Sequence, residues 1–154
     1  MNISIHLATS IIVTIVLWPF LSWYSLWIIV GGFLIDVDHY LYAGFKWKMW
    51  NLKESYHYQK EKLKQEAKKN GEILHIFHTI EFWIFMIVMA YLSYQKEWTF
   101  LFYIFTVTFV GMILHLILDG IYALYAKRLG ERTISLIWWL KKFKGRKEVL
   151  KKAF

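Results

Sequence analysis

Four long apolar stretches take up most of this chain, and they leave few folds open to it. They run from about Ile3 to Leu17, from Ser22 to about Tyr42, from Ile73 to about Tyr94, and from Trp98 to about Ala126. About 20 mostly apolar residues are enough to cross a bilayer as a helix. Hydrophobic residues also make up 58% of only 154 residues, which is more than a soluble domain of this size can bury. The sequence therefore predicts an all-α, integral membrane bundle with four transmembrane helices.

A further helix is expected in the cytoplasmic loop 44–71, which joins the second and third stretches. Asn51 is a favourable N-cap and Glu54 follows it three residues later, as in a capping box. The Asn70-Gly71 pair is typical of a helix end. We therefore expect one short helix within this loop.

The C-terminal tail has the pattern of a helix that lies on a membrane. Apolar residues from Ile134 to Leu140 are followed by a Lys-rich run, and this segment is too short and too basic to span. We therefore predict an interfacial helix. The chain would then consist of a four-helix transmembrane domain that carries the metal site, 1–130, and a basic amphipathic tail, 131–154.

Basic residues predict the orientation of the bundle. The loop 44–71 carries eight Lys, the chain from Lys127 onward carries ten Lys or Arg, and the remaining turns carry one of the 19. The positive-inside rule then places the loop and both termini in the cytoplasm of a multi-pass protein of the cell (inner or plasma) membrane. The net charge of +8 finds its partner in anionic inner-leaflet headgroups among the membrane lipids. No nucleic-acid partner is expected.

Side chains that can bind metal lie inside the apolar stretches, where charges are costly. The candidates are four carboxylates and five histidines: His6, Asp36, Asp38, His39, His75, His78, Glu81, His115 and Asp119. No Lys or Arg lies inside the stretches to pair with the acids, and a charge at mid-membrane costs about 2.5–3.5 kcal/mol on insertion scales. Because the predicted spans alternate in direction, all nine are expected near the cytoplasmic face of one leaflet.

Their spacing and chemistry favour a metal site. His115 and Asp119 are four residues apart, and His78 and Glu81 are three apart, so each pair would share a helix face. Imidazole and carboxylate donors in a chain without Cys suit a divalent metal such as Zn or Mn. The nine ligands are enough for two ions, which in two-metal sites clamp a phosphate. Asp38 and Glu81 are the candidate catalytic bases. Each residue taken alone also has a structural interpretation, as a helix cap or a hydrogen bond between helices.

Four short elements occur in the order seen in a known family. They are Ile5-His6-Leu7, Leu34-Ile35-Asp36-Val37-Asp38-His39, Phe77-His78-Thr79 and Leu114-His115-Leu116-Ile117-Leu118-Asp119. Together they resemble the YdjM-like family of small membrane-bound, metal-dependent hydrolases. The resemblance covers roughly His6 to Tyr122. It implies a multi-span helical protein with a hydrolase activity that depends on a divalent metal.

Some positions depart from the family pattern. Ile35 stands where the family usually has proline. The third family element typically reads H-R-x-x-T-H-S. Here His78 takes the place of the second histidine, His75 is two positions out of register with the first, and the arginine has no counterpart. Such an arginine could bind a substrate phosphate through two hydrogen bonds. The chain thus resembles a divergent member, in which Glu81 is a candidate compensating ligand.

The leading prediction is a membrane-embedded metal-dependent hydrolase that acts at the cytoplasmic leaflet. Its expected substrate is a lipid or another amphiphilic ester, with a phosphoester as the first choice, and its nucleophile is a metal-activated water. A nucleophilic serine is not expected, because the chain has no Gly-x-Ser-x-Gly element. Two non-enzymatic alternatives stay open. One is a carrier of metal ions or protons, because intramembrane acids and histidines also mark transport pathways. The other is a scaffold with a vestigial metal site.

Overall fold

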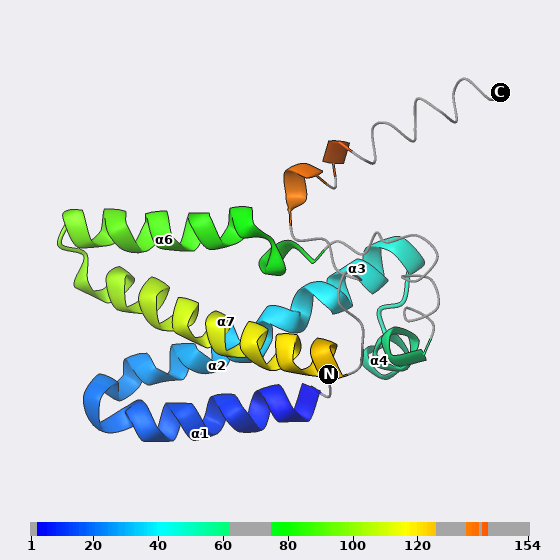
Figure 1. The fold of residues 1–154 in the computed structure, drawn as a ribbon, viewed down its shortest axis with the longest axis horizontal. Coiled ribbons are helices and arrows are strands. Elements are labelled where there is room, and N and C mark those ends of the chain that lie inside the picture. The colour runs from blue at the N-terminus through cyan, green and yellow to red at the C-terminus, as the bar shows by residue number, and fades with distance from the viewer. Residues whose placement is uncertain (1–2, 62–74, 126–134, 139, 142–154) are drawn as a thin grey trace. The chain divides into compact units, whose positions relative to one another are not determined.

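The structure, a computed structural model, describes residues 3–61, 75–125, 135–138 and 140–141. In these ranges it contains helices and turns but no strand, which confirms the all-α class. The elements follow in this order: α1 (Ile3–Leu21), η1 (Ser22–Leu26), α2 (Trp27–Gly32), η2 (Leu34–Asp36), α3 (Val37–Trp47), α4 (Leu52–Glu61), η3 (Ile76–His78), α6 (Ile80–Gln95) and α7 (Thr99–Tyr125). The elements labelled η are short 3-10 turns (Figure 1).

The chain divides into two compact units, and each is described by itself. Unit 1 consists of Met1–Val37 and Phe82–Leu129, and unit 2 consists of Asp38–Glu81 and Gly130–Phe154. Both units are therefore built from two separate parts of the sequence. The expected division into a membrane domain, 1–130, and a tail, 131–154, stays a prediction.

Unit 1 is built from two helical hairpins. In the first, α1 turns back through η1 into α2, and in the second α6 turns back into α7 (Figure 1). Ser22 and Glu97 lie at these two reversals and have positive φ angles of 49° and 57°. A backbone in this left-handed region leaves the helical path, which is how a chain reverses direction within a few residues.

Glycines bring α2 and α7 into backbone contact. A Cβ on Gly31 would overlap the carbonyl oxygen of Thr108, and a Cβ on Gly111 would lie 2.5 Å from the carbonyl oxygen of Ile28. Small residues at a helix interface allow this approach, as they do between transmembrane helices. The close contact matters for the site, because α2 and α7 each contribute polar groups to it.

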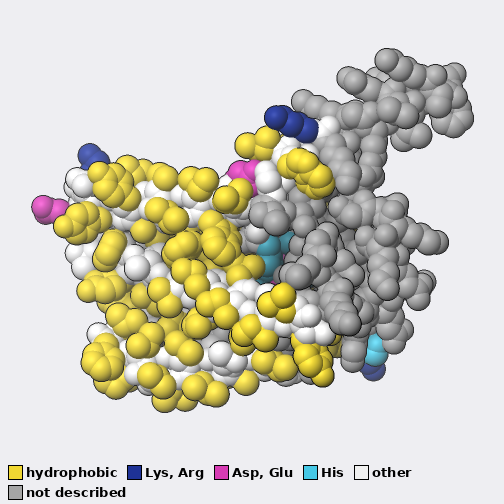
Figure 2. Space-filling model, in the orientation of Figure 1, with side chains coloured by type: hydrophobic (Ala, Val, Ile, Leu, Met, Phe, Trp, Pro, Cys, Tyr) yellow, Lys and Arg dark blue, Asp and Glu magenta, His cyan; other side chains and the backbone are white. Residues whose placement is uncertain are grey.

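Unit 1 buries polar side chains together with apolar ones such as Ile28 and Met112, and it leaves many large apolar side chains exposed. The buried residues of α1 are His6, Ser10 and Thr14, at a spacing of four. Large apolar residues face outward instead, with Phe20 83% exposed and Trp23 72% exposed. Figure 2 shows apolar side chains covering α1, α6 and α7 on the face in view. A soluble domain buries most of its large apolar side chains, since burial of apolar surface stabilises it in water.

Two helical stretches in the described residues are long and apolar enough to cross a membrane. They are Ile3–Phe45, 43 residues with a mean hydropathy of 1.9, and Thr99–Tyr122, 24 residues with a mean hydropathy of 2.3. The four separate spans expected from the sequence are not supported. The first two merge into one stretch that bends at η1, and α6 has 16 residues, or about 24 Å at 1.5 Å per residue. The apolar run counted from Ile73 starts before the helix does.

Unit 2 contains α4 and all of α3 except its first residue, and the expected bounds of the cytoplasmic loop stay a prediction. The second apolar stretch is not one helix, because α2 ends at Gly32 and α3 begins only at Val37. α3 then runs to Trp47. The expected N-cap is confirmed: Asn51 Oδ1 accepts hydrogen bonds from the backbone N–H groups of Lys53 and Glu54, at 3.0 and 3.3 Å.

The C-terminal segment is helical where the structure describes it. Residues 136–138 form a helical turn, and Ser135 precedes it as its N-cap, because the Ser135 hydroxyl accepts a hydrogen bond of 3.2 Å from the backbone N–H of Trp138. This agrees with the short helix expected in the tail. The expected helix end at Asn70-Gly71 and the basic run after residue 141 lie outside the described residues.

Candidate metal centre

The buried ring of His115 on α7 is the centre of a polar cluster in unit 1. Its side chain has no exposed surface. Its Nδ1 lies 2.9 Å from the carbonyl oxygen of Gly32 at the end of α2. A carbonyl oxygen can only accept, so Nδ1 must carry the proton of this hydrogen bond. The ring is thereby fixed in one orientation and one tautomer, as in metal sites where the second ring nitrogen donates to a carbonyl group.

The other nitrogen of His115 faces two carboxylates. Its Nε2 lies 3.3 Å from Asp36 Oδ1 and 3.4 Å from Asp119 Oδ2. With Nδ1 protonated, a neutral ring presents a lone pair at Nε2, and a lone pair repels a carboxylate. Either a proton on Nε2 or a cation between these atoms removes the repulsion. The site therefore has the donor set and the need for positive charge that a divalent metal satisfies.

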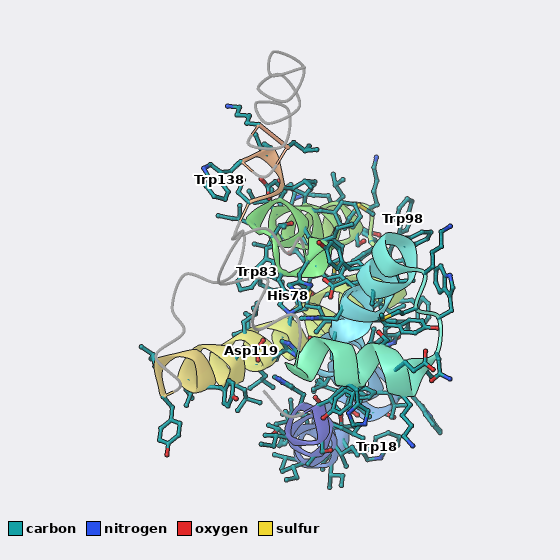
Figure 3. All side chains as sticks on the ribbon, turned by 90° about the vertical axis from the view of Figure 1, so that its right-hand side faces the viewer. Trp18, His78, Trp83, Trp98, Asp119 and Trp138 are labelled. Atoms are coloured by element: carbon teal, nitrogen blue, oxygen red, sulfur yellow. The ribbon has the colours of Figure 1, made fainter. Side chains whose placement is uncertain are left out.

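His6 on α1 completes this group, which we call the His115 cluster (His6, Asp36, His115 and Asp119). His6 Nε2 lies 3.2 Å from Asp119 Oδ1, and the ring stacks on His115 at 3.9 Å between centroids. His6 Nδ1 is buried and has no hydrogen-bond partner. One ligand atom each from His6, His115 and Asp119 lies within 4.8 Å of the others. Asp119 comes from the last third of α7 (Figure 3).

A second group lies in unit 2, and we call it the Asp38 cluster (Asp38, His39, His75 and His78). Asp38 Oδ2 accepts a hydrogen bond of 3.2 Å from the backbone N–H of Phe77 and lies 3.3 Å from His78 Nδ1. These contacts hold η3, whose last residue is His78 (Figure 3), against the start of α3. The rings of His39 and His75 stack with 3.5 Å between their centroids.

The second oxygen of Asp38 has the environment of a metal ligand. Asp38 Oδ1 is buried and makes no hydrogen bond. It lies 3.7 Å from His75 Nδ1 and 3.9 Å from His39 Nε2. Two ligands at about 2.0–2.1 Å from a tetrahedral metal are about 3.3 Å apart, so these atoms are a few tenths of an ångström wider than a closed site. Contraction around one ion would bring all three atoms to ligand distance.

Nearly all of the chain's aspartates and histidines belong to the two clusters. The sequence contains three aspartates and six histidines, and all the aspartates and five of the histidines belong to one cluster or the other. The remaining histidine, His57, is exposed on α4. The Asp36-Val37-Asp38-His39 motif divides its ligands, with Asp36 in the His115 cluster and the other two in the Asp38 cluster. Buried His/Asp clusters that can hold a metal ion are thus present.

Among the described residues, Glu81 belongs to none of the groups whose ligand atoms lie close together. Its two carboxylate oxygens accept three hydrogen bonds from Ser135, Leu136 and Ile137 of the C-terminal segment. The Ser135 hydrogen bond, aided by the two backbone N–H groups and opposed by desolvation, lowers the pKa of Glu81 from 4.5 to about 2. A carboxylate with so low a pKa is a weak base near neutral pH. Its expected role as a ligand or catalytic base stays a prediction.

Sequence reasoning missed the backbone groups that support the clusters. The carbonyl oxygen of Gly32 orients His115, and the N–H of Phe77 binds Asp38. The Gly31-Gly32 pair inside an apolar stretch is a signal of close helix approach that could have pointed to the first of them. His75 and His78 do not share the face of a regular helix, because His75 is extended and His78 ends a 3-10 turn. Asp38 nevertheless holds them together.

Comparison with known proteins adds no relative from which a role could be carried over. No family model matches the chain, and no curated protein or solved structure matches it either.

Proposed function

We propose that this protein is a membrane-embedded, metal-dependent hydrolase that acts on a lipid or another amphiphilic ester, most directly a phosphoester, at the cytoplasmic leaflet. One observation carries the proposal: His115 Nε2, fixed by the hydrogen bond from Nδ1 to Gly32, faces carboxylate oxygens of Asp36 and Asp119 at 3.3 and 3.4 Å. The ordered motifs that resemble the YdjM-like family supply the same candidate ligands and support the same chemistry.

The ligands fit Zn²⁺ or Mn²⁺, with one ion for each cluster. Both clusters combine imidazole nitrogens with carboxylate oxygens, which suits these metals. A divalent cation, when bound, supplies positive charge that polarises a phosphoryl or carbonyl oxygen and makes water a stronger acid. The surrounding apolar residues of unit 1 strengthen such electrostatic effects, because they keep the local dielectric constant low.

Asp38 is the proposed catalytic base of this chain. Its Oδ2 is held by Phe77 N–H and His78, whereas its Oδ1 makes no hydrogen bond. An oxygen with a fixed position and a free lone pair can accept a proton from an attacking water. Where Oδ1 would instead hold a divalent metal, Asp38 would act as a ligand and not as the base.

The many exposed apolar side chains of unit 1 support a location in the bilayer. Many of its large apolar side chains face outward, whereas polar ones such as His6, Ser10 and Thr14 are buried. The basic loop and tail further support cytoplasmic termini. Within the 43-residue stretch, the reversal at η1 would allow α1 and the chain after it to cross in opposite directions. Single cysteines at residues 20 and 57, tested with a membrane-impermeant thiol reagent in right-side-out and inverted vesicles, would establish this topology, since the chain has no cysteine of its own.

The turn between α3 and α4 with its flanking residues, 45–52, which we call the elbow, supports a contact with anionic headgroups. Trp50 packs against Phe45, with ring centroids 5.2 Å apart, and the Tyr40 hydroxyl donates a hydrogen bond of 2.6 Å to the Trp50 carbonyl oxygen. Phe45 is nevertheless 77% exposed and Leu52 70% exposed, and the neighbouring Lys48 is also exposed. Rigid exposed aromatic groups beside lysine are typical of the membrane–water interface.

The buried hydroxyls do not favour a carrier. A row of polar side chains on α1 continues from His6 through Ser10 and Thr14. However, Ser10 donates its proton to the carbonyl oxygen of His6 at 2.7 Å, and Thr14 donates to that of Ser25 at 3.2 Å. Hydroxyls committed to backbone oxygens serve helix packing, so we place the hydrolase first.

Elemental analysis of the purified full-length protein in detergent tests the proposal. We expect bound Zn or Mn in stoichiometric amount, and hydrolysis of a chromogenic phosphodiester with an acyl chain in mixed micelles. The double variant H115A/D119A should lose metal and activity, whereas H57A, which removes an exposed histidine outside both clusters, should retain them. Protein without bound metal, or full metal content in the double variant, would refute the proposal. Metal flux into proteoliposomes without hydrolysis would favour the carrier.

A further inference from the structure

The Glu81 carboxylate accepts three hydrogen bonds from the C-terminal segment. The Ser135 hydroxyl donates to Glu81 Oε1 at 2.6 Å, the Leu136 N–H donates to Oε2 at 2.9 Å, and the Ile137 N–H donates to Oε1 at 3.1 Å. These backbone groups begin a helical turn and have no acceptor within it. One carboxylate thus joins two parts of unit 2 that are more than 50 residues apart in sequence.

The contact is strong because the carboxylate is charged. Hydrogen bonds to an ionised acceptor are shorter and stronger than neutral ones, and the 2.6 Å separation from Ser135 agrees with this. The same hydrogen bonds hold the pKa of Glu81 at about 2. Glu81 therefore keeps its charge, and the contact persists, throughout the pH range in which proteins usually function.

Glu81 is also close in sequence to two members of the Asp38 cluster, His75 and His78. Glu81 is the second residue of α6 and follows His78 by three positions. Thr79 between them is buried, and its hydroxyl donates to the Ile76 carbonyl oxygen at 2.7 Å, which closes the η3 turn. His78 in turn lies 3.3 Å from Asp38. Glu81 is therefore connected to His78 by only two residues, one of which is hydrogen-bonded to the η3 turn.

We propose that Glu81 is a positioning residue, not a metal ligand, and that it ties the C-terminal segment at Ser135 to the turn that presents His75 and His78 to Asp38. This inference rests on the proposed function in so far as the Asp38 cluster binds metal. The C-terminal segment is then a structural part of that site. Positioning groups of this kind typically change metal affinity by about 10–100-fold.

Hydrogen exchange in the metal-free, full-length protein tests the connection itself. The variant is E81Q, which removes the charge but keeps the side-chain length, and the matched control is E54Q, an exposed glutamate on α4 of the same unit. We expect E81Q to speed amide exchange in peptides covering both 135–138 and 76–79, because both ends of the contact open more often. E54Q should change neither. Unchanged exchange at 76–79 in E81Q would overturn the proposal.

A metal titration then separates a positioning residue from a ligand. A spin label is attached to a cysteine at position 137, where the native side chain is 55% exposed and the backbone N–H remains available. If Glu81 positions the turn, saturation with Zn²⁺ leaves the label immobilised, whereas E81Q makes it mobile. If Glu81 is a ligand, Zn²⁺ draws the carboxylate away and releases the label in the otherwise unmodified chain, which would overturn the proposal.

Zinc affinity gives the quantitative outcome. E81Q and S135A should each weaken binding by about tenfold or more without changing the number of ions bound. The double variant should bind Zn²⁺ no more weakly than E81Q alone, because Ser135 affects the metal site only through its hydrogen bond to Glu81. Loss of one whole ion in E81Q alone would again indicate a ligand. If the parent protein binds no Zn²⁺, the proposed function fails, and the hydrogen exchange and metal-free label data still decide whether Glu81 holds the turn.

Discussion

The substitution Gly31→Ala tests how tightly the His115 cluster depends on the contact between α2 and α7. A methyl group at this position would overlap the carbonyl oxygen of Thr108 and would lie 2.8 Å from the backbone nitrogen of Met112. Ordinary van der Waals contact begins at 3.4 Å, so the Met112 contact alone requires a separation of about 0.6 Å. Both obstacles are backbone atoms, which cannot rotate away as a side chain can.

This separation is large enough to break the hydrogen bond that orients the His115 ring. The hydrogen bond from His115 Nδ1 to the Gly32 carbonyl oxygen is 2.9 Å long, and an added 0.6 Å would take it to about 3.5 Å, the outer limit for such a bond. Overpacking of this kind typically costs about 1–3 kcal/mol of folding free energy. We expect metal affinity to fall by about 10–100-fold as well, because the ring loses the group that orients it.

Gly120→Ala is the matched control. Gly120 also lies in α7, but a Cβ there meets nothing within 4 Å. Both substitutions gain the same helix propensity, up to about 1 kcal/mol, so the difference between them isolates the packing cost. Thermal unfolding in detergent should place Gly31→Ala several degrees below Gly120→Ala, at about 2–4 °C per kcal/mol for a chain of this size. Equal midpoints and equal metal affinities would refute the reasoning.

Three further outcomes are expected. Asp38→Asn should lower the zinc content by one ion per chain, whereas His57→Asn should not; equal zinc content in the two variants, measured by elemental analysis, would contradict the assignment of the Asp38 cluster. Because hydrogen bonds lower the pKa of Glu81 from 4.5 to about 2, its contact stabilises the folded chain fully above about pH 4.5 and loses this effect as pH falls toward 2. A spin label at residue 137 should therefore give one spectrum from pH 8 to 5 and become mobile only in stronger acid, and a transition near pH 7 would count against this explanation. A spin label at a cysteine that replaces Phe45 should be more accessible to oxygen than to a nickel chelate in proteoliposomes with anionic lipid, and a label at His57 should show the reverse; aqueous behaviour at both positions would argue against insertion of the elbow.

The helical class and the candidate ligands could be predicted because both depend on local sequence. Long apolar stretches favour helices in any arrangement, and acids or histidines inside them stand out from their neighbours. The Asn51 cap was predictable for the same reason, since its hydrogen bonds to Lys53 and Glu54 span three residues. Apolar length did not predict where helices end. α2 stops at Gly32 and α6 starts only at Ile80, because backbone turns interrupt a stretch whose hydropathy is continuous.

The amino-acid sequence by itself determined the helical class of this chain and the chemistry of its candidate ligands, because residue type and short spacing are local properties. Only the tertiary structure decided how those ligands are divided. It places Asp36 with His115 and Asp38 with His75 and His78, although the two aspartates are separated by one residue. It also directs Glu81 to Ser135 rather than to a histidine. The physical reason is that these contacts join residues up to 79 positions apart, as between Asp36 and His115. Helix packing and turns bring such residues together, and no short sequence pattern encodes them.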